Sequence, residues 1–346
     1  MRLHQRKMAI KEYFEDVYNR VIDQKDNYEK TTLAVGEYFA DIYTSDSELK
    51  RVFFYSIAHL ITYNAVTLSS LTIYCITDDI LEERLKAPTL CADELSLNGT
   101  YNNSDSDRYF IFYQPWLHQI YLYDSLHNIA IYWVKSINNI PWWEPTFSFR
   151  IIFHWWSLKT PYQLIHSGAI SKDGNKTFIF PAPSGSGKST TTLQLWLSGF
   201  LYLGDDYIMI DVDKNIVYQL YSTAKVETIT LEKFLPELKE KIINKNELQK
   251  QKGILHIENL QKIYSLPISG IIIPNISSDN YGIFECNKSA AQLAIAPTTL
   301  HHLPHNRETS FRKITKLVQT NKTYIWNLPP LKDSLVNQFS QFQVNE

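Results

Sequence analysis

A lysine, a serine and two aspartates are spaced in this sequence in a way that suits chemistry on a phosphate group. Lys188 and Ser189 follow a loop of small residues, and Asp205 and Asp206 come soon afterwards along the chain. A lysine ammonium can neutralise β- and γ-phosphates, a serine hydroxyl can bind Mg²⁺, and a carboxylate can bind the metal or accept a proton from an attacking hydroxyl. The four residues therefore predict a site that binds ATP with Mg²⁺ and acts on the terminal phosphate.

The loop before Lys188 has the composition of a phosphate-binding loop. Gly185 and Gly187 lack a Cβ atom, so backbone N–H groups can approach phosphate oxygens, and a helix beginning near Lys188 directs its positive end to the same place. Ala182 stands where the motif G-x-x-x-x-G-K-[ST] has its first glycine, and alanine lacks the free access of glycine to positive φ. The residues expected to contact the nucleotide are Ser184, Gly185, Ser186, Gly187, Lys188, Ser189 and Thr190.

The alternative interpretation of this loop is a turn rich in glycine and serine that binds no phosphate. The elements around the loop argue against it. An apolar strand over residues 178–180 leads into the loop, a helix follows and stops at Gly199, and a second short strand delivers Asp205. This order of strand, loop, helix and strand is typical of an α/β nucleotide-binding core.

The spacing of the loop and the acid pair resembles that of the HPr serine kinase/phosphorylase family and of a looser group of HPr-kinase-like proteins. The resemblance rests on S-G-x-G-K-S at residues 184–189 and on L-x-x-x-G-F-x-x-x-x-D-D at residues 195–206. His166-Ser167-Gly168 is similar to a family segment that lies beside the phosphate site. Four further segments resemble the HPr-kinase-like group only, namely residues 142–145 (WWEP), 154–156 (HWW), 221–225 (YSTAK) and 293–300 (LAIAPTTL). The likeness spans roughly residues 105–340.

The resemblance implies a fold and a set of roles. The fold is a P-loop core with a mixed sheet and flanking helices. Asp205 is the implied general base and Asp206 the implied Mg²⁺ ligand together with Ser189, although the two acids can exchange these roles. His166 is either a residue of the phosphate site or an ordinary sheet histidine, and Lys225 either steadies the transferred phosphoryl group or is a solvated lysine at a strand end. The expected catalytic residues are thus Asp205, Lys188, His166 and Lys225.

Two features of the HPr kinases are missing from this chain. It has no R-G-x-G segment and no clear match to the glycine-containing substrate loop. HPr as substrate and the reverse phosphorylase activity are therefore not carried over. What remains is an ATP-dependent phosphotransferase acting on a hydroxyl, most simply a serine of a peptide or protein. The alternatives are a small-molecule kinase or NTPase on the same core, or a nucleotide-binding module with little turnover, in which Ala182 would be a sign of drift.

A chain of 346 residues fits two domains or one domain with an extension. We expect an α+β region over residues 1–150, which could bind substrate, and the kinase domain over residues 151–346. In the first region the patterns predict helices over 5–45, strand over 49–77 and an antiparallel meander over 108–134, and a buried helix over 149–157 follows at the boundary. In the second they predict strands over 164–171, 268–274 and 324–327, and helices over 231–252, 289–296, 307–319 and 331–342.

Composition excludes several classes of protein. A net charge of −2 argues against a dedicated nucleic-acid binder. The three cysteines are scattered, which predicts neither a disulfide framework nor a zinc site, and His301, His302 and His305 lack a fourth metal ligand and are expected in a loop. No signal peptide and no apolar stretch of membrane-spanning length is evident, so we expect a cytoplasmic protein without a membrane partner. The oligomeric state, including a homo-oligomer, stays open.

Overall fold

The computed structural model describes residues 9–63, 69–78, 84–90, 94–96, 99–105, 107–248, 252–257, 265–277 and 279–342. The chain forms two compact units, Met1–Lys159 and Thr160–Glu346. The boundary expected from the sequence, between residues 150 and 151, lies at the start of helix α3 (Arg150–Ser157), which belongs to the N-terminal unit. Each unit has its own sheet and its own hydrophobic core.

A seven-stranded sheet forms the centre of the N-terminal unit, with the strand order β1-β2-β3-β7-β6-β5-β4. Strand β3 runs parallel to both its neighbours, and the other pairs are antiparallel. The strands are β1 (Glu29–Val35), β2 (Tyr38–Thr44), β3 (Leu71–Thr77), β4 (Tyr101–Asp105), β5 (Tyr109–Gln114), β6 (Gln119–Asp124) and β7 (Ile129–Val134). Strands β5 to β7 confirm the meander predicted over residues 108–134.

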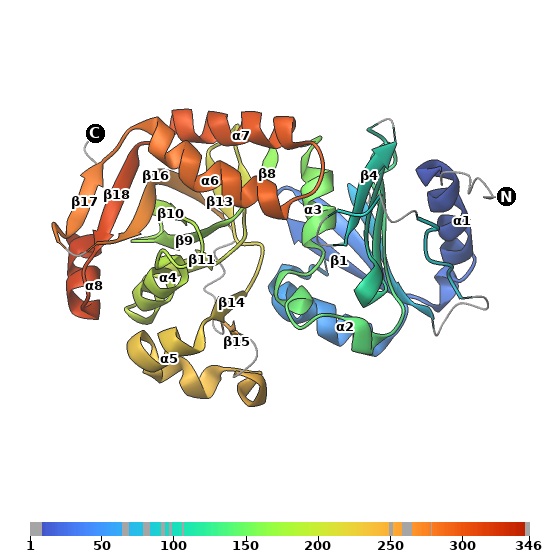
Figure 1. Ribbon diagram of the computed structural model, residues 1–346, viewed down its shortest axis with the longest axis horizontal. Helices are drawn as coiled ribbons and strands as arrows, with labels where there is room; N and C mark the ends of the chain where they lie inside the picture. The colour runs from blue at the N-terminus through green and yellow to red at the C-terminus, as the bar shows by residue number, and fades with distance from the viewer. Residues whose placement is uncertain are drawn as a thin grey trace. The chain divides into compact units, whose positions relative to one another are not determined.

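Helices cover both faces of this sheet (Figure 1). Helix α1 (Ile10–Ile22) packs Phe14 and Val17 against a face that includes Ile131 of β7. On the other face, the Phe53 ring of α2 (Ser47–Phe53) lies 4.7 Å from the ring of Tyr132, the next residue of β7. Helix α3, the buried helix predicted over 149–157, packs Trp155 against Phe110 on that same side. Much of the high aromatic content is therefore core packing.

Two predictions for the N-terminal unit are wrong. The first helix stops at Ile22, and residues 29–44 form β1 and β2, because their side chains alternate between buried and exposed with the period of a strand. Residues 47–53 form helix α2 where we expected strand. The Asp46 carboxylate caps this helix by accepting the backbone N–H groups of Glu48 and Leu49. Of the predicted 49–77 strand, only β3 forms, and residues 64–68 lie outside the described part.

The C-terminal unit has a nine-stranded mixed sheet in its described part. The main order is β11-β9-β10-β16-β13-β12-β8, and β18 pairs with both β16 and β17. The long strand β16 (Ser265–Ile276) runs parallel to β10 (Thr177–Pro181) and β18 (Thr323–Leu328), and antiparallel to β13 (Ile216–Tyr218). The remaining strands are β8 (Tyr162–Ile165), β9 (Ser167–Ser171), β11 (Leu201–Gly204), β12 (Ile208–Asp211) and β17 (Gly282–Glu285). The predicted α/β class with a mixed sheet and flanking helices is confirmed.

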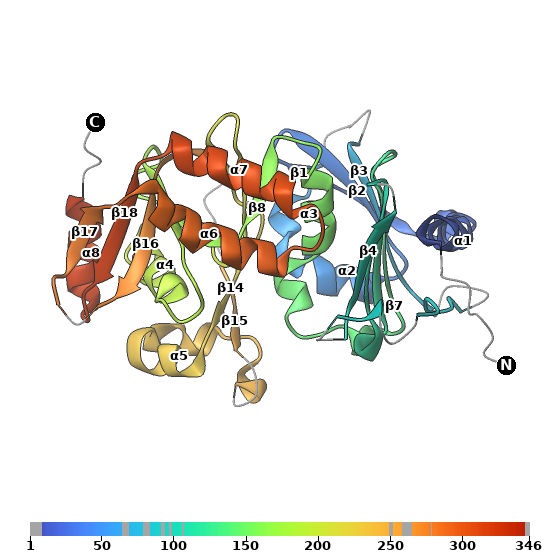
Figure 2. The same cartoon turned by 45° about the horizontal axis from the view of Figure 1, so that its top comes forward.

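Helices flank this second sheet on both faces. Phe178 and Phe180 of β10 pack in one core with residues of α4 (Lys188–Leu197) and α8 (Lys332–Gln341). Ile179, which points the other way, packs in a second core with residues of α6 (Lys288–His302) and α7 (Arg307–Thr320). Figure 2 shows α6 and α7 side by side. Both faces of β10 are therefore buried under helices, and the strand runs parallel to β16 and antiparallel to β9.

The elements β16, α7, β18 and α8 confirm the strands and helices predicted at their positions. Three other predictions for the C-terminal unit need correction. The strand predicted over 164–171 divides at His166 into β8 and β9. In place of a helix over 231–252 there is α5 (Thr228–Phe234), followed by short 3₁₀ turns that begin at Pro236, because proline cannot continue a helix. The strands on either side of this segment, β14 (Thr223–Val226) and β15 (Gly253–His256), pair with each other as a two-stranded antiparallel sheet. Helix α6 passes Pro297 and ends at His302, later than expected.

The helices in the described part of the chain include none that is both long and apolar enough to cross a membrane.

Candidate active site

The predicted phosphate loop connects strand β10 to helix α4. Gly185 and Gly187 have φ values of 82° and 91°, a left-handed conformation that glycine adopts without strain. Gly187 is the N-cap of α4 and has no side chain to bond the first-turn N–H groups, which leaves them directed at the loop. The Ser186 hydroxyl donates a 2.7 Å hydrogen bond to the Pro183 carbonyl and fixes the loop from within.

The departure from the loop motif at Ala182 has no conformational cost in this structure. Ala182 is fully buried, and it is not among the described residues with positive φ. The freedom of glycine is therefore not needed at this position. Ser184 and Gly185 are exposed, and Ser189 and Thr190 are partly exposed, so the predicted nucleotide contacts lie at an accessible surface.

The acid pair lies at a point where two neighbouring chain segments both change their strand partners. Strand β8 pairs with β12 and β9 pairs with β11, so the chain changes partners at His166 on one segment and at Asp205-Asp206 on the other. The backbone N–H of Ser167 donates to the Asp206 carbonyl at 3.0 Å. The two breaks thus lie opposite each other and bring His166 beside the acids.

Asp206 has an unusual backbone conformation. Its φ is 64°, and the Tyr207 N–H donates to the Asp205 carbonyl at 2.8 Å, which closes a three-residue γ-turn around it. Such turns with a left-handed central residue are rare and strained, and strain of this kind concentrates at functional sites. The turn also needs a glycine before it, because a Cβ atom at Gly204 would lie 2.7 Å from Cγ2 of Ile208.

The Asp206 carboxylate is the centre of a largely buried charge cluster. Its Oδ1 atom lies 2.5 Å from Lys188 Nζ and 3.4 Å from His166 Nε2, and its Oδ2 atom lies 3.4 Å from Lys225 Nζ. Lys188 Nζ is also 4.0 Å from Asp205 Oδ1. The structure therefore brings together all four predicted catalytic residues, Asp205, Lys188, His166 and Lys225, with the predicted metal ligand Asp206.

The charges of this cluster stabilise one another. Burial opposes the ionised form of Asp206, but the positive charges of Lys188 and Lys225 outweigh it and hold the pKa of Asp206 well below its usual range. Burial likewise lowers the pKa of Lys188, and the two aspartates more than reverse this and raise it. Asp206 and Lys188 therefore form an ion pair at neutral pH.

Asp205 differs from its neighbour. It is fully buried, and neither carboxylate oxygen meets the geometry of a hydrogen bond to any described residue. Burial raises the pKa of Asp205, only partly offset by the charge of Lys188 and by the nearby Ser189 hydroxyl. Asp205 is thus the acid of the pair that is nearer to accepting a proton at neutral pH.

His166 is neutral at neutral pH, because burial and the charge of Lys188 lower its pKa. Its ring centroid lies 5.3 Å from that of His302 and 5.4 Å from that of Tyr207. Its backbone N–H donates a 3.1 Å hydrogen bond to the Thr299 hydroxyl. Helix α6 therefore contacts the chain at His166, between β8 and β9, through the hydrogen bond that Thr299 accepts and a ring contact from His302.

Sequence reasoning missed the part played by α6. His301 and His302 were expected in a loop, but they form the last turn of α6, and His302 lies against His166. The helix was expected to end at residue 296, yet Pro297 lies inside it, and the Thr298 hydroxyl donates to the carbonyls of Ala294 and Ile295 in the turn around the proline. The available signal was the segment over 293–300 that resembles the HPr-kinase-like group and contains Thr299.

A metal at this site would need ligands from the substrate. The residues that the structure describes contain no group of three or more His, Cys, Asp or Glu side chains placed to hold a metal. The carboxylates of Asp205 and Asp206 and the Ser189 hydroxyl beside Asp205 are nevertheless the hard oxygen ligands that Mg²⁺ prefers, and Mg²⁺ commonly completes its shell with phosphates and water. The residues present fit that mode of binding.

In comparisons with known proteins, no family model matches this chain, and no curated protein matches it at a significant level.

Proposed function

We propose that this protein is an ATP-dependent phosphotransferase that transfers the terminal phosphoryl group to a hydroxyl. The observation that carries the proposal is the buried cluster of Lys188, Asp205, Asp206, His166 and Lys225, set directly behind a loop whose two glycines have left-handed conformations. Phosphoryl transfer requires mainly positioning and electrostatic stabilisation, and a cluster of this kind supplies both.

Lys188 and Lys225 are the groups that would meet the transferred phosphoryl group. Both ammonium groups lie against one carboxylate, so both point toward the same small volume beside the loop. Phosphate oxygens that replaced the Asp206 contact would be bound by two positive charges at once. A bound Mg²⁺ would add further neutralisation of the phosphates. His166, which is neutral and buried, positions Lys188 and Asp206 and contributes no charge.

Asp205 is the proposed acceptor of the hydroxyl proton. Its pKa is raised by burial, whereas the pKa of Asp206 is depressed by two lysines, and a general base works best with a pKa near the working pH. Ser189 and Asp206 are then the proposed Mg²⁺ ligands. Because Ser189 lies beside Asp205, the alternative is that Asp205 binds the metal and Asp206 is the base. The test must distinguish these two assignments.

The phosphate acceptor is proposed to be a serine of a peptide or protein, which is what the resemblance to the HPr-kinase-like group implies. A small hydroxylated metabolite is the alternative acceptor. A nucleotide-binding module with little turnover is the alternative from a different class. It predicts ATP binding without release or transfer of phosphate.

The proposal is tested by phosphate transfer and ATP turnover in the wild type, Asp205→Asn and Asp206→Asn. If Asp205 is the base, Asp205→Asn lowers turnover by about 10²- to 10⁴-fold while Mg²⁺-dependent ATP binding persists. If it is the metal ligand, the Mg²⁺ concentration needed for half-maximal binding rises instead. Asp213→Asn is the control, since Asp213 is an exposed aspartate paired with Lys316. Wild-type turnover in Asp205→Asn, or none in the wild type with any acceptor, would overturn the proposal.

A further inference from the structure

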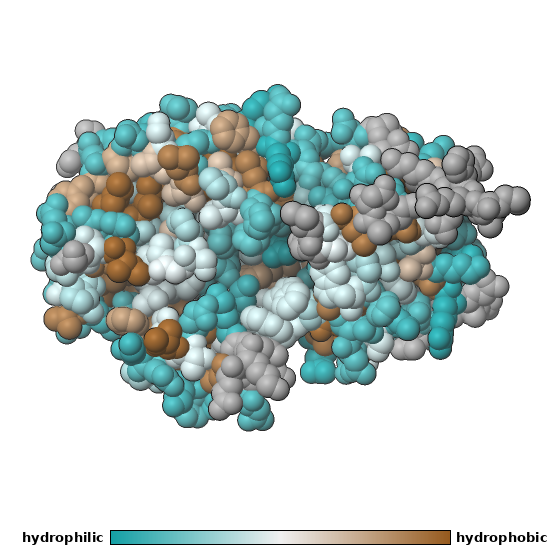
Figure 3. All heavy atoms as spheres, in the orientation of Figure 1, coloured by the Kyte–Doolittle hydropathy of each residue, from teal (hydrophilic) through white to brown (hydrophobic). Residues whose placement is uncertain are grey.

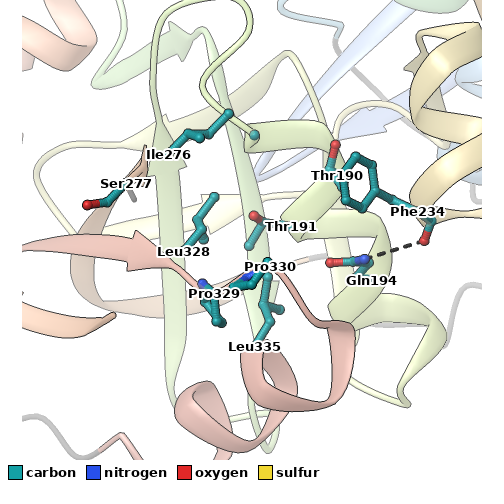
Figure 4. A pocket seen from close by; sticks show the side chains of 11 residues that line it. Thr190, Thr191, Gln194, Phe234, Ile276, Ser277, Leu328, Pro329, Pro330 and Leu335 are labelled. Carbon is teal, nitrogen blue, oxygen red and sulfur yellow. Dashed lines mark hydrogen bonds between the residues drawn. The ribbon is translucent and has the colours of Figure 1, made fainter. Parts of the chain in front are cut away.

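A small pocket lies beside the phosphate loop, on the flank of α4. Its volume is about 230 Å³. One wall consists of Thr190, Thr191 and Gln194 of α4, and the ends of β16 and β18 supply the facing wall, which includes Ile276 and Leu328 (Figure 4). Phe234 of α5 closes a third side, where the Gln194 side-chain amide donates to its carbonyl at 3.4 Å.

The strand order places this pocket opposite the acids. In the sheet, β11, which delivers Asp205 and Asp206, lies on one side of β10, and β16 and β18 lie on the other. The phosphate loop leaves β10 between them. A molecule whose terminal phosphate met Lys188 and Asp205, with its chain of phosphates along the loop, would therefore carry its other end toward the β16 and β18 side.

Gly187 joins the loop and the pocket. It is the N-cap of α4 and also lines the pocket. A Cβ atom there would lie 2.7 Å from Cδ1 of Leu328 and 4.0 Å from the Thr191 hydroxyl oxygen. The pocket is thus continuous with the proposed phosphate site.

The chemistry of the pocket suits a flat, uncharged group. None of its lining residues carries a charge, and most of the lining is apolar. The polar groups of the lining are the hydroxyls of Thr190, Thr191 and Ser277 and the Gln194 amide, which donates to the Phe234 carbonyl. The Thr191 hydroxyl is buried at 1 % exposure and has no hydrogen-bond partner among the described residues. A hydroxyl can rotate to donate or accept, so it could bond either kind of edge atom of a planar ring. Ile276 of the lining and Leu331, the residue after Pro330, are both 67 % exposed. Figure 3 shows that hydrophobic residues also reach the surface of the C-terminal unit on the face in view.

We propose that this pocket binds the base of the nucleotide and accepts adenine and guanine alike. The proposal rests on the proposed function, since it needs a nucleotide on the loop. Pockets that enclose a drug-sized ligand measure roughly 300–1,000 Å³, so this smaller one suits one ring system. Phe234, 43 % exposed at its side, offers an aromatic face for stacking. Recognition is by shape and stacking, because the hydroxyls of the lining can rotate to donate or accept and the Gln194 amide N–H is already bonded to the Phe234 carbonyl.

The test compares the affinities of ATP, GTP and inorganic tripolyphosphate, each with Mg²⁺, for the wild type and three variants. We expect ATP and GTP to bind within a few-fold of each other and both to bind more tightly than tripolyphosphate. Phe234→Ala should weaken ATP and GTP by about 5- to 100-fold, the usual value of a base–aromatic stack, and leave tripolyphosphate unchanged. Thr191→Val, which keeps the shape and removes the hydroxyl, should weaken ATP and GTP by a smaller factor.

Phe311→Ala is the matched control, because Phe311 of α7 is similarly exposed, at 46 %, and does not line the pocket. Equal loss of all three ligands in Phe234→Ala, no loss of any, or a strong preference for one purine would overturn the pocket assignment while leaving the phosphate site standing. Failure of the wild type to bind any of the three would overturn the proposed function itself, and this inference with it.

Discussion

Asp205 and Asp206 are neighbours in the chain with opposite environments. Asp206 lies against two lysines and a histidine, whereas Asp205 is fully buried, with Lys188 Nζ 4.0 Å away and the Ser189 hydroxyl nearby. The sequence could predict the pair, because its spacing from Lys188 is a local pattern. It could not predict which acid meets the cations. That depends on the left-handed turn at Asp206, which strand pairing imposes.

The charge of Asp206 should be essential for stability. Asp206→Asn tolerates the left-handed conformation but leaves Lys188, which is only 5 % exposed, without its closest counter-charge. Breaking a buried ion pair in this way costs about 3–5 kcal/mol. Urea unfolding should show that loss of free energy for Asp206→Asn. Asp213→Asn, in which an exposed pair is broken, should lose about 1 kcal/mol or less. Equal stability of the two variants would contradict the pairing described for Asp206.

At the scale of elements, segments with a regular pattern of apolar residues were predictable from the sequence. Points at which the chain changes its strand partner or its secondary structure were not. Alternating or helical patterns of apolar residues correctly predicted the meander of β5 to β7, helix α3 and helix α7. The strand over 164–171 looked continuous because every residue in it except His166 is apolar or small, and only its pairing with two different partners divides it at His166. Residues 231–252 looked helical from their lysines and leucines. Pro236 and the pairing of β15 with β14 decide otherwise.

The packing of α4 against β9 depends on the absence of a side chain at Gly168. A Cβ atom there would lie 2.5 Å from the Thr192 hydroxyl oxygen, and that hydroxyl bonds the carbonyl of Lys188 at 2.9 Å. Gly168→Ala should therefore push α4 outward, cost about 1–3 kcal/mol of stability and weaken ATP binding. The double variant Gly168→Ala/Thr192→Ala, which makes room for the methyl group, should recover most of both losses in thermal unfolding and titration. Additive losses would show that the close approach is not the cause.

At the scale of the whole molecule, the two units have separate cores, and the N-terminal unit contains a polar cluster of Asp124, Arg108 and His127. The Arg108 guanidinium and the His127 ring both bond the Asp124 carboxylate, at 2.9 and 2.7 Å. The hairpin that carries Asp124 is part of the predicted meander, but this cluster was not predicted from the sequence. Asp124 and Arg108 are separated by a full strand, and only the register of β5 against β6 brings them together. Long-range pairs of this kind have no local signature.

This cluster around Asp124 should make the unfolding free energy of the protein decrease in acid. Burial raises the pKa of Asp124, but the bonds from Arg108 and His127 outweigh it and lower the pKa to about 2, from 3.8. Since the folded value lies below the unfolded one, the ionised group stabilises the fold above about pH 4, and this stabilisation is lost as pH falls toward 2. The difference in unfolding free energy between wild type and Asp124→Asn should therefore shrink over that range. A difference that stays constant from pH 5 to pH 2 would contradict the assignment.

The central claim is that the loop before Lys188 binds a nucleoside triphosphate. Calorimetric titration of Mg²⁺-ATP into the wild type, Lys188→Ala and the exposed-lysine control Lys176→Ala measures it directly. We predict one ATP bound per chain in the wild type and in Lys176→Ala, and a loss of affinity of at least tenfold in Lys188→Ala, about 1.4 kcal/mol or more. Absence of binding in the wild type, or equal affinity in Lys188→Ala, would contradict the account.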